Sequence, residues 1–126
     1  MTTTLQPRLI VSDAAKALAF YADALGAEVH SKHTDDDGLI VNADLTVAGA
    51  PFTVKDETPG TTDLSPTSFG GTPVLLRLTV PDVDALGARM ERAGATVVFP
   101  ISDHPYGRMG RFTDPYGHIW MLSQSD

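Results

Sequence analysis

Two arginines, Arg8 and Arg77, are the side chains of this sequence best suited to bind an anion. Each lies in a short apolar strand pattern, RLIV or RLTV, that ends near an aspartate, Asp13 or Asp82. A planar guanidinium can hold a carboxylate or phosphonate through two parallel hydrogen bonds. Because the arginines occupy equivalent positions, they are candidates to hold such an anion together. The alternative, left open by the sequence, is that they pair with acids such as Asp44 and only satisfy a polar interior.

Other residue types that carry chemistry do not form a recognised motif. His30 and His33 stand three apart in a strand pattern, which places them on opposite faces. We expect His104 in a loop and His118 directly after a turn, so no three ligands converge as zinc requires. The acidic run 35–37 lacks the spacing of a calcium loop and predicts a solvated turn. Without cysteine, the chain has neither a thiolate nucleophile nor a disulfide.

The two arginines belong to an internal repeat, residues 8–29 and residues 77–98. Each copy reads as a strand, an aspartate suited to begin a helix, and apolar residues at helical spacing. Gly26 or Gly94 then ends the helix, and a second strand follows. Chance similarity of two unrelated strand–helix units is the alternative, but residues match in register across strand, cap, helix and stop. We therefore predict a duplication.

The remaining segments extend the repeat to two copies of β-α-β-β-β in one domain, residues 1–126. We expect module 1 at 1–57, a linker rich in Pro, Gly, Ser and Thr at 58–72, and module 2 at 73–126. The fold class is α+β. The expected strands are Leu5–Val11, Ala27–His33, Leu39–Val47, Pro51–Asp56, Val74–Val80, Ala95–Pro100, Arg108–Thr113 and His118–Ser123, with a loop at Ile101–Gly107.

Composition excludes several classes of function. Nine basic and sixteen acidic residues give a net charge of −7, which argues against binding nucleic acid or an anionic membrane surface. No apolar run is long enough for a membrane span, and the first residues do not resemble a signal peptide. We therefore expect a cytoplasmic protein without nucleic-acid or membrane partners.

The duplicated plan resembles a known superfamily. The phrases VSDAAKALAFYADALGAEV, VPDVDALGARMERAGATVVFP and YGRMGRFTDPYGHIWML are similar to those of the vicinal oxygen chelate superfamily. This superfamily includes glyoxalase I, extradiol dioxygenases, fosfomycin-resistance enzymes and bleomycin-binding proteins, and the likeness is greatest to the PhnB-like branch. The resemblance implies two half-barrel sheets that enclose a ligand cup, commonly in a homodimer.

The resemblance also implies a divalent metal held by four side chains on the first and last strands of the modules. The matching positions carry Gln6, Thr53, Leu75 and Met121. Leucine cannot bind a divalent ion, and methionine is a poor ligand for a hard one. We therefore expect a protein without a metal or another cofactor.

Strand alternation predicts which side chains line the cup. The expected cup-facing residues are Gln6, Arg8, Ile10, Asn42, Asp44, Thr53, Lys55, Leu75, Arg77, Thr79, Ile119 and Met121. Phe52 and Trp120 have the opposite parity and are expected in the core. Tyr106 and Arg108 are expected near the mouth of the cup, with a surface tyrosine and a solvated arginine as the alternative.

Two classes of function remain open at this point. One is a metal-free protein that sequesters a small, partly apolar compound with an anionic group as one option, as drug-binding members linked to antibiotic resistance do. The other is an enzyme of the lyase, isomerase or dioxygenase type. The substituted metal positions favour binding, with ligand contacts expected at Gln6, Arg8, Asn42, Asp44, Thr53, Leu75, Arg77, Tyr106 and Met121. The sequence identifies no catalytic residue.

Overall fold

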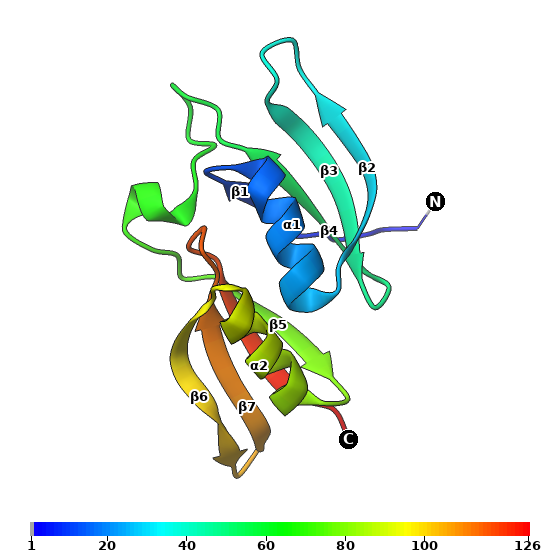
Figure 1. Cartoon of the computed structure of the whole chain (residues 1–126), viewed down its shortest axis with the longest axis vertical. Helices are drawn as coiled ribbons and strands as arrows, with labels where there is room; N and C mark the ends of the chain where they lie inside the picture. Colours follow the sequence, from blue (N-terminus) through cyan, green and yellow to red (C-terminus); the bar gives the residue numbers. More distant parts are fainter. Residues whose placement is uncertain (1) are drawn as a thin grey trace.

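The computed structural model describes residues 2–126, which form two four-stranded sheets, each covered by one helix (Figure 1). The first half contains β1 (Arg8–Val11), α1 (Ala14–Leu25), β2 (Glu28–Thr34), β3 (Ile40–Val47) and β4 (Ala50–Asp56). The second half contains β5 (Leu75–Val80), α2 (Val83–Ala93), β6 (Thr96–His104), β7 (Gly107–Thr113) and β8 (Ile119–Gln124). A short 3-10 helix, η1 (Pro66–Phe69), lies between them. The predicted α+β fold of two β-α-β-β-β units is confirmed.

The helix boundaries follow from the same local chemistry in both halves. The Asp13 side chain accepts a hydrogen bond from the backbone N of Lys16 at 3.1 Å, and Asp82 does the same for Ala85 at 3.1 Å. These carboxylates satisfy free donors at each helix start. Gly26 closes α1 with a φ of 68°, a left-handed conformation that glycine adopts without steric cost.

Both sheets have the same topology. The strand order is β1-β4-β3-β2 in the first sheet and β5-β8-β7-β6 in the second. The first strand of each half runs parallel to the last, and the other pairs are antiparallel. Arg8 pairs with Thr53 in the first sheet, and Arg77 pairs with Met121 in the second. The internal repeat therefore continues through the register of the strands.

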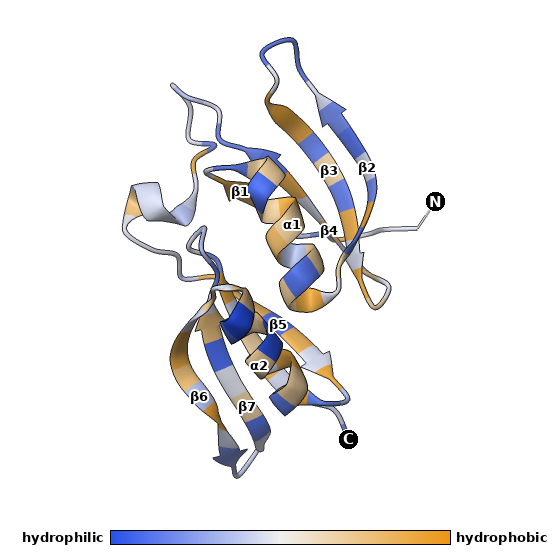
Figure 2. Ribbon diagram, in the orientation of Figure 1, coloured by the Kyte–Doolittle hydropathy of each residue, from blue (hydrophilic) through white to orange (hydrophobic). Residues whose placement is uncertain are grey.

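Each sheet has one face against the helices and one face away from them, which we call its open face. Orange and blue residues alternate along β3 in Figure 2, as expected for a strand with one buried side. The helix α2 approaches the second sheet closely at Gly87, where an added Cβ would lie 2.3 Å from Cδ1 of Ile101. None of the helices within residues 2–126 is long and apolar enough to cross a membrane.

The core runs from one half into the other rather than lying within each half. The helices α1 and α2 pack together, and the buried apolar side chains form a single cluster. Tyr21 lies edge-on to Phe52, with ring centroids 5.7 Å apart, and Phe52 lies edge-on to Trp120 at 5.9 Å. Phe52 and Trp120 are 5% exposed, which confirms their predicted place in the core.

A buried carboxylate joins the two halves at this cluster. Asp114, in the turn before β8, is 3% exposed. Its side chain accepts hydrogen bonds from the hydroxyl of Tyr21 at 2.6 Å and from Nε1 of Trp120 at 3.0 Å. The backbone N–H groups of Tyr116 and His118 donate to its other oxygen at 2.9 and 3.0 Å. Four donors compensate for the loss of water around this group.

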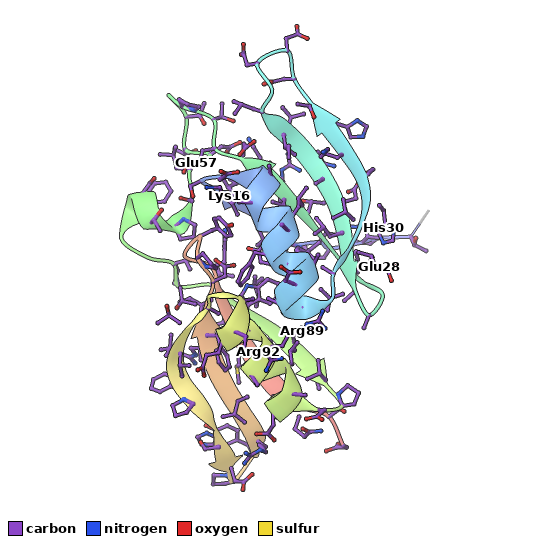
Figure 3. The ribbon with its side chains drawn as sticks, viewed as in Figure 1. Lys16, Glu28, His30, Glu57, Arg89 and Arg92 are labelled. Atoms are coloured by element: carbon purple, nitrogen blue, oxygen red, sulfur yellow. The ribbon has the colours of Figure 1, made fainter. Side chains whose placement is uncertain are left out.

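Two further contacts fix the halves at their margins. Arg89 of α2 donates to the backbone carbonyls of Asp23 and Ala22 at the end of α1, and Figure 3 labels it where the helices meet. A cation at this place also interacts favourably with the negative, C-terminal end of the α1 dipole. On the opposite side, Nε2 of His118 lies 2.8 Å from the carbonyl oxygen of Ile10.

Two expected boundaries are wrong. The expected loop at Ile101–Gly107 is mostly strand, because β6 continues to His104 and pairs with β7 there. Pro100 lies in this edge strand at the irregularity between Phe99 and Ser102, and both an edge and a bulge tolerate a residue without a backbone N–H. The first strand begins at Arg8 rather than Leu5, although the carbonyl of Pro7 still accepts from the backbone N of Thr53.

Replacing Tyr21 with phenylalanine removes the hydroxyl that joins α1 to Asp114 and keeps the packed ring. The free energy of unfolding at pH 7 should fall by about 1.5–3 kcal/mol, because a hydrogen bond to a charged acceptor is lost in a buried site. Urea unfolding, followed by the fluorescence of the single tryptophan, measures the change.

The stability of the same variant should depend on alkaline pH differently from that of the wild type. Burial and the nearby charge of Asp114 raise the pKa of Tyr21 well above its usual value. The protonated Tyr21 hydroxyl contributes fully to the free energy of unfolding below about pH 10, where tyrosine in the unfolded chain is also protonated. This contribution is lost as the pH rises through the pKa that Tyr21 has in the folded protein. Above pH 10 the wild type should lose about 1.4 kcal/mol per pH unit more than Tyr21→Phe. Tyr106→Phe, at an exposed position, should match the wild type; an equal slope in Tyr21→Phe would contradict this assignment.

Candidate functional site

The predicted site residues lie on the open faces of the two sheets. In the first sheet, cross-strand pairing aligns one residue from each strand into a row, which we call the first row: Arg8, Thr53, Asp44 and Ser31. Asn42 lies on the same strand as Asp44, and exposed Gln6 precedes β1 by two residues. The structure therefore gathers Arg8, Asn42, Asp44 and Thr53 on one surface.

Hydrogen bonds hold the polar side chains of this surface in place. The guanidinium of Arg8 donates to Oδ1 of Asn42 at 2.6 Å and to the carbonyl oxygen of Val41 at 2.9 Å. The hydroxyl of Ser31 donates to the carboxylate of Asp44 at 2.5 Å. Hydrogen bonds from Ser31 and Asn42 lower the pKa of Asp44 below its ordinary value, so this surface presents an ionised carboxylate at neutral pH.

The equivalent row of the second sheet, the second row, consists of Arg77, Met121, Arg111 and Phe99. Nε of Arg77 donates to the hydroxyl of Ser123 at 3.1 Å. The Cζ atom of Arg111 lies 5.2 Å from the ring centroid of Phe99, within the range of a cation–π interaction. This row is therefore cationic and apolar, whereas the first row is polar.

A cavity of about 340 Å³ lies over the part of the second row formed by Met121, Arg111 and Phe99, while Arg77 borders a neighbouring cavity of about 290 Å³. The larger cavity is lined by Phe99, Pro100, Ser102, His104, Tyr106, Met109, Gly110, Arg111 and Met121. The rings of His104 and Tyr106 stack at its margin with centroids 5.3 Å apart. Its size and its mixture of apolar walls with a few polar groups are typical of a small-molecule site, for which volumes of roughly 300–1,000 Å³ are usual.

Arg8 and Arg77 do not form the internal ion pairs that the sequence left open. Within residues 2–126, salt bridges join Lys55 to Asp63 and Arg108 to two acids. Neither Arg8 nor Arg77 takes part in these pairs. Their guanidinium groups bond to neutral oxygens and keep capacity for an anion.

Two residues expected at the cup are used elsewhere. Lys55 has the predicted parity, but it is 8% exposed and its Nζ donates to Asp63 and Thr58 of the linker. The linker thus covers one end of the first open face. Arg108 bonds in bidentate fashion to Asp84 of α2 and also contacts Asp103, which ties the β6–β7 hairpin to the helix.

The four positions implied for a metal do not fit one. Thr53 and Met121 are paired with Arg8 and Arg77, respectively, so each would bring an ion next to a guanidinium. The set offers one amide, one hydroxyl, one alkyl group and one thioether, whereas a hard divalent ion needs several oxygen or nitrogen ligands. No group of three His, Asp or Glu side chains suited to a metal occurs among residues 2–126.

Sequence reasoning missed Arg111, Phe99 and Met109. The internal repeat could have indicated Arg111, because the strand register places Arg111 opposite Met121 just as it places Asp44 opposite Thr53. Carrying the repeat through the third strand of each half would have identified this position. Phe99 was hidden by the bulge between Val97 and Phe99, which changes the strand parity.

Comparison with known proteins places this geometry in a family. The pattern of the glyoxalase/bleomycin resistance protein/dioxygenase superfamily matches residues 3–122. An uncharacterized protein of Mycobacterium bovis is 43% identical over 124 residues, covering 95% of this chain and 82% of that protein. An uncharacterized protein of Mycobacterium tuberculosis has the same identity over 124 residues, with 95% of this chain and 73% of that protein covered.

Solved structures show the same fold. TioX from Micromonospora superposes with a TM-score of 0.76 at 26% identity, covering 98% of both chains. The fosfomycin resistance protein FosX from Listeria monocytogenes superposes with a TM-score of 0.74 at 18% identity, covering all of this chain and 95% of that one; this likeness concerns the fold alone. The chain belongs to the glyoxalase/bleomycin resistance protein/dioxygenase superfamily.

Proposed function

We propose that this protein binds a small, partly apolar compound between its open faces without a metal ion. The supporting observation is the chemistry of the two rows. The positions that would hold a metal carry Thr53 and Met121, while the neighbouring arginines are fixed but unpaired with acids. Binding and sequestration need only such contacts, whereas the metal-dependent lyase, isomerase and dioxygenase reactions need a Lewis acid. The motif phrases also lead us to assign the chain to the PhnB-like branch.

The cup is completed by a second copy of the chain. Within one chain, α1 and α2 lie against each other and the two sheets share no strand pairing. Large side chains remain uncovered on the second open face: Leu75 is 37% exposed and Phe99 is 57% exposed. Among residues 2–126, β1 and β5 each lie at an end of their sheet, with no strand beside the outer edge. A symmetric dimer can set the first open face of one chain opposite the second open face of its partner. Such a dimer would cover both open faces.

Metal analysis tests the absence of a resident ion. Protein purified without a chelator or an affinity tag should contain far less than one divalent ion per chain, because the four positions lack suitable donors. Inductively coupled plasma mass spectrometry measures the content. A stoichiometric ion whose loss changes the melting temperature would favour the enzyme alternative.

Substitution of Arg8 or Arg77 tests the role of that side chain in binding. A thermal-shift screen of small anionic and neutral compounds supplies the ligand, since a compound at 100 times its Kd stabilises by about 2.7 kcal/mol. Arg8→Met and Arg77→Met should each weaken an anionic hit held between the two rows by about ten- to a hundredfold, the loss of one charge-assisted contact; an anion held by the second row alone should respond to Arg77→Met only. Isothermal titration calorimetry gives the affinities.

The same two variants should unfold almost as the wild type does without ligand. Neither arginine has a buried acid partner that the substitution would strand, so the expected loss of stability is below about 1 kcal/mol. Arg92→Met, on the exposed side of α2 and labelled in Figure 3, serves as the matched control. A loss of about 3–5 kcal/mol with unchanged affinity would assign both arginines to internal structure instead.

Mixing the two variants tests the shared cup. In a dimer that joins one chain's first open face to its partner's second, a heterodimer of Arg8→Met and Arg77→Met contains one cup with both substitutions and one with neither. Co-expression should therefore restore wild-type affinity in about a quarter of all cups. Sedimentation should also give twice the chain mass of 13.4 kDa. A monomer, or no restored binding, would place the cup within one chain.

A further inference from the structure

The two rows are copies of one ancestral arrangement with opposite character. Both begin with an arginine, on β1 or β5, and continue across three neighbouring strands. The third position is Asp44 in the first row and Arg111 in the second, because each pairs with the residue that follows the arginine in its row. A position that is anionic on one wall is therefore cationic on the other.

The second row has two positive charges and no acid to neutralise them. Arg77 donates to a serine hydroxyl and Arg111 lies over the ring of Phe99. Neither takes part in the salt bridges found within residues 2–126. Neighbouring strands lie about 4.8 Å apart, so two strand steps separate the backbones of the arginines by roughly 10 Å. Met121 lies between them in the row: Arg111 lines the cavity on one side of it, and Arg77, which borders a neighbouring cavity, lies on the other, so a carboxylate above Met121 would lie between the two side chains.

The surface around these charges is suited to a flat, polarisable group. Met109 and Met121 present thioethers, and Phe99 and Tyr106 present rings, to the same cavity of about 340 Å³. Thioether sulfur contacts aromatic rings favourably, and offset aromatic rings attract each other. A simple inorganic anion would leave these apolar groups exposed to water.

The first row excludes the opposite orientation. Asp44 is held by Ser31 at 2.5 Å, and a ligand anion placed beside it would be repelled. Arg8 is close enough to offset part of this charge but donates to Asn42 and Val41. A ligand with an anionic end is thus directed toward the second row by attraction on one wall and repulsion on the other.

We propose that the second row is the receptor for an aromatic carboxylate, with Arg77 and Arg111 binding the carboxylate and Phe99, Met109 and Met121 contacting the ring. This inference rests on the proposed function and specifies the class of its ligand. Arg111 is then a specificity-determining residue that faces the ligand from β7, at the position where the first sheet has Asp44.

Three probes separate the parts of this inference: 2-naphthoate, its neutral amide 2-naphthamide, and inorganic phosphate. Methyl-¹³C methionine labelling of the full chain reports where each one binds. Met109 and Met121 lie at the cavity, whereas Met90 is fully buried in the core and serves as an internal reference. We expect 2-naphthoate to shift the signals of Met109 and Met121, to leave Met90 unchanged, and to bind at least tenfold more tightly than either other probe.

Arg111→Gln removes one charge from the site and keeps a polar side chain of similar length. Its affinity for 2-naphthoate should fall by about ten- to a hundredfold, while its affinity for 2-naphthamide should change by less than about threefold. Arg92→Gln, on the exposed side of α2, should change neither affinity. Equal losses for both probes would show that Arg111 acts through the shape of the site rather than its charge, and would overturn the inference.

The failures of the two proposals are distinguishable. If 2-naphthamide binds as well as 2-naphthoate, or phosphate binds as well as either, the aromatic carboxylate is the wrong class while small-molecule binding stands. The same conclusion holds if neither aromatic probe shifts Met109 or Met121 but a compound from the thermal-shift screen does. If no probe and no screened compound binds, the proposed function fails together with this inference.

Discussion

The structure depends on one buried carboxylate that must keep its hydrogen bonds. Asp114 is nearly inaccessible, and its donors come from both halves: Tyr21 from α1, and Trp120 with two backbone groups from the β7–β8 region. An uncompensated charge at this depth would cost several kcal/mol, so the halves cannot separate without exposing or stranding it. Since two of its donors are the aromatic side chains of Tyr21 and Trp120, these residues also fill the shared core. One polar group therefore fixes how two small sheets share a single hydrophobic interior.

That shared core determines where a site can form. The sheet faces turned toward the helices are buried in the shared core. The side chains that a ligand can reach therefore lie on the open faces. There the strands present Arg8, Asp44, Arg77 and Arg111 with neutral partners or none, while the ion pairs of the chain, Lys55–Asp63 among them, hold loops and hairpins. Structural charges are paired and surface-facing charges of the two rows are not. This separation supports a binding role for the rows.

Much of this arrangement was predictable because it depends on local rules. Helix caps at Asp13 and Asp82, glycine stops and strand alternation act over a few residues, and the repeat supplied the register of Arg8 and Arg77. The extension of β6 through Pro100 was not predictable, because the sheet edge and the irregular pairing between Phe99 and Ser102, which make a proline acceptable there, are features of the folded sheet. The hydrogen bond that Asp114 accepts from Tyr21 was not predictable either, because it depends on how the two halves pack and not on a local sequence pattern.

Duplication gives two walls with the same geometry, and later substitution can change each wall separately. Thr53 and Asp44 make one row hydrophilic, while Met121 and Arg111 at the corresponding places make the other apolar and cationic. A pair of identical walls would bind a ligand with two different ends equally well in two orientations. Walls that differ in charge at the third position lower the energy of one orientation and raise that of the other. Under the proposed function, the divergence of this one position, Asp44 against Arg111, would let a cup built from two related walls hold its ligand in a single direction.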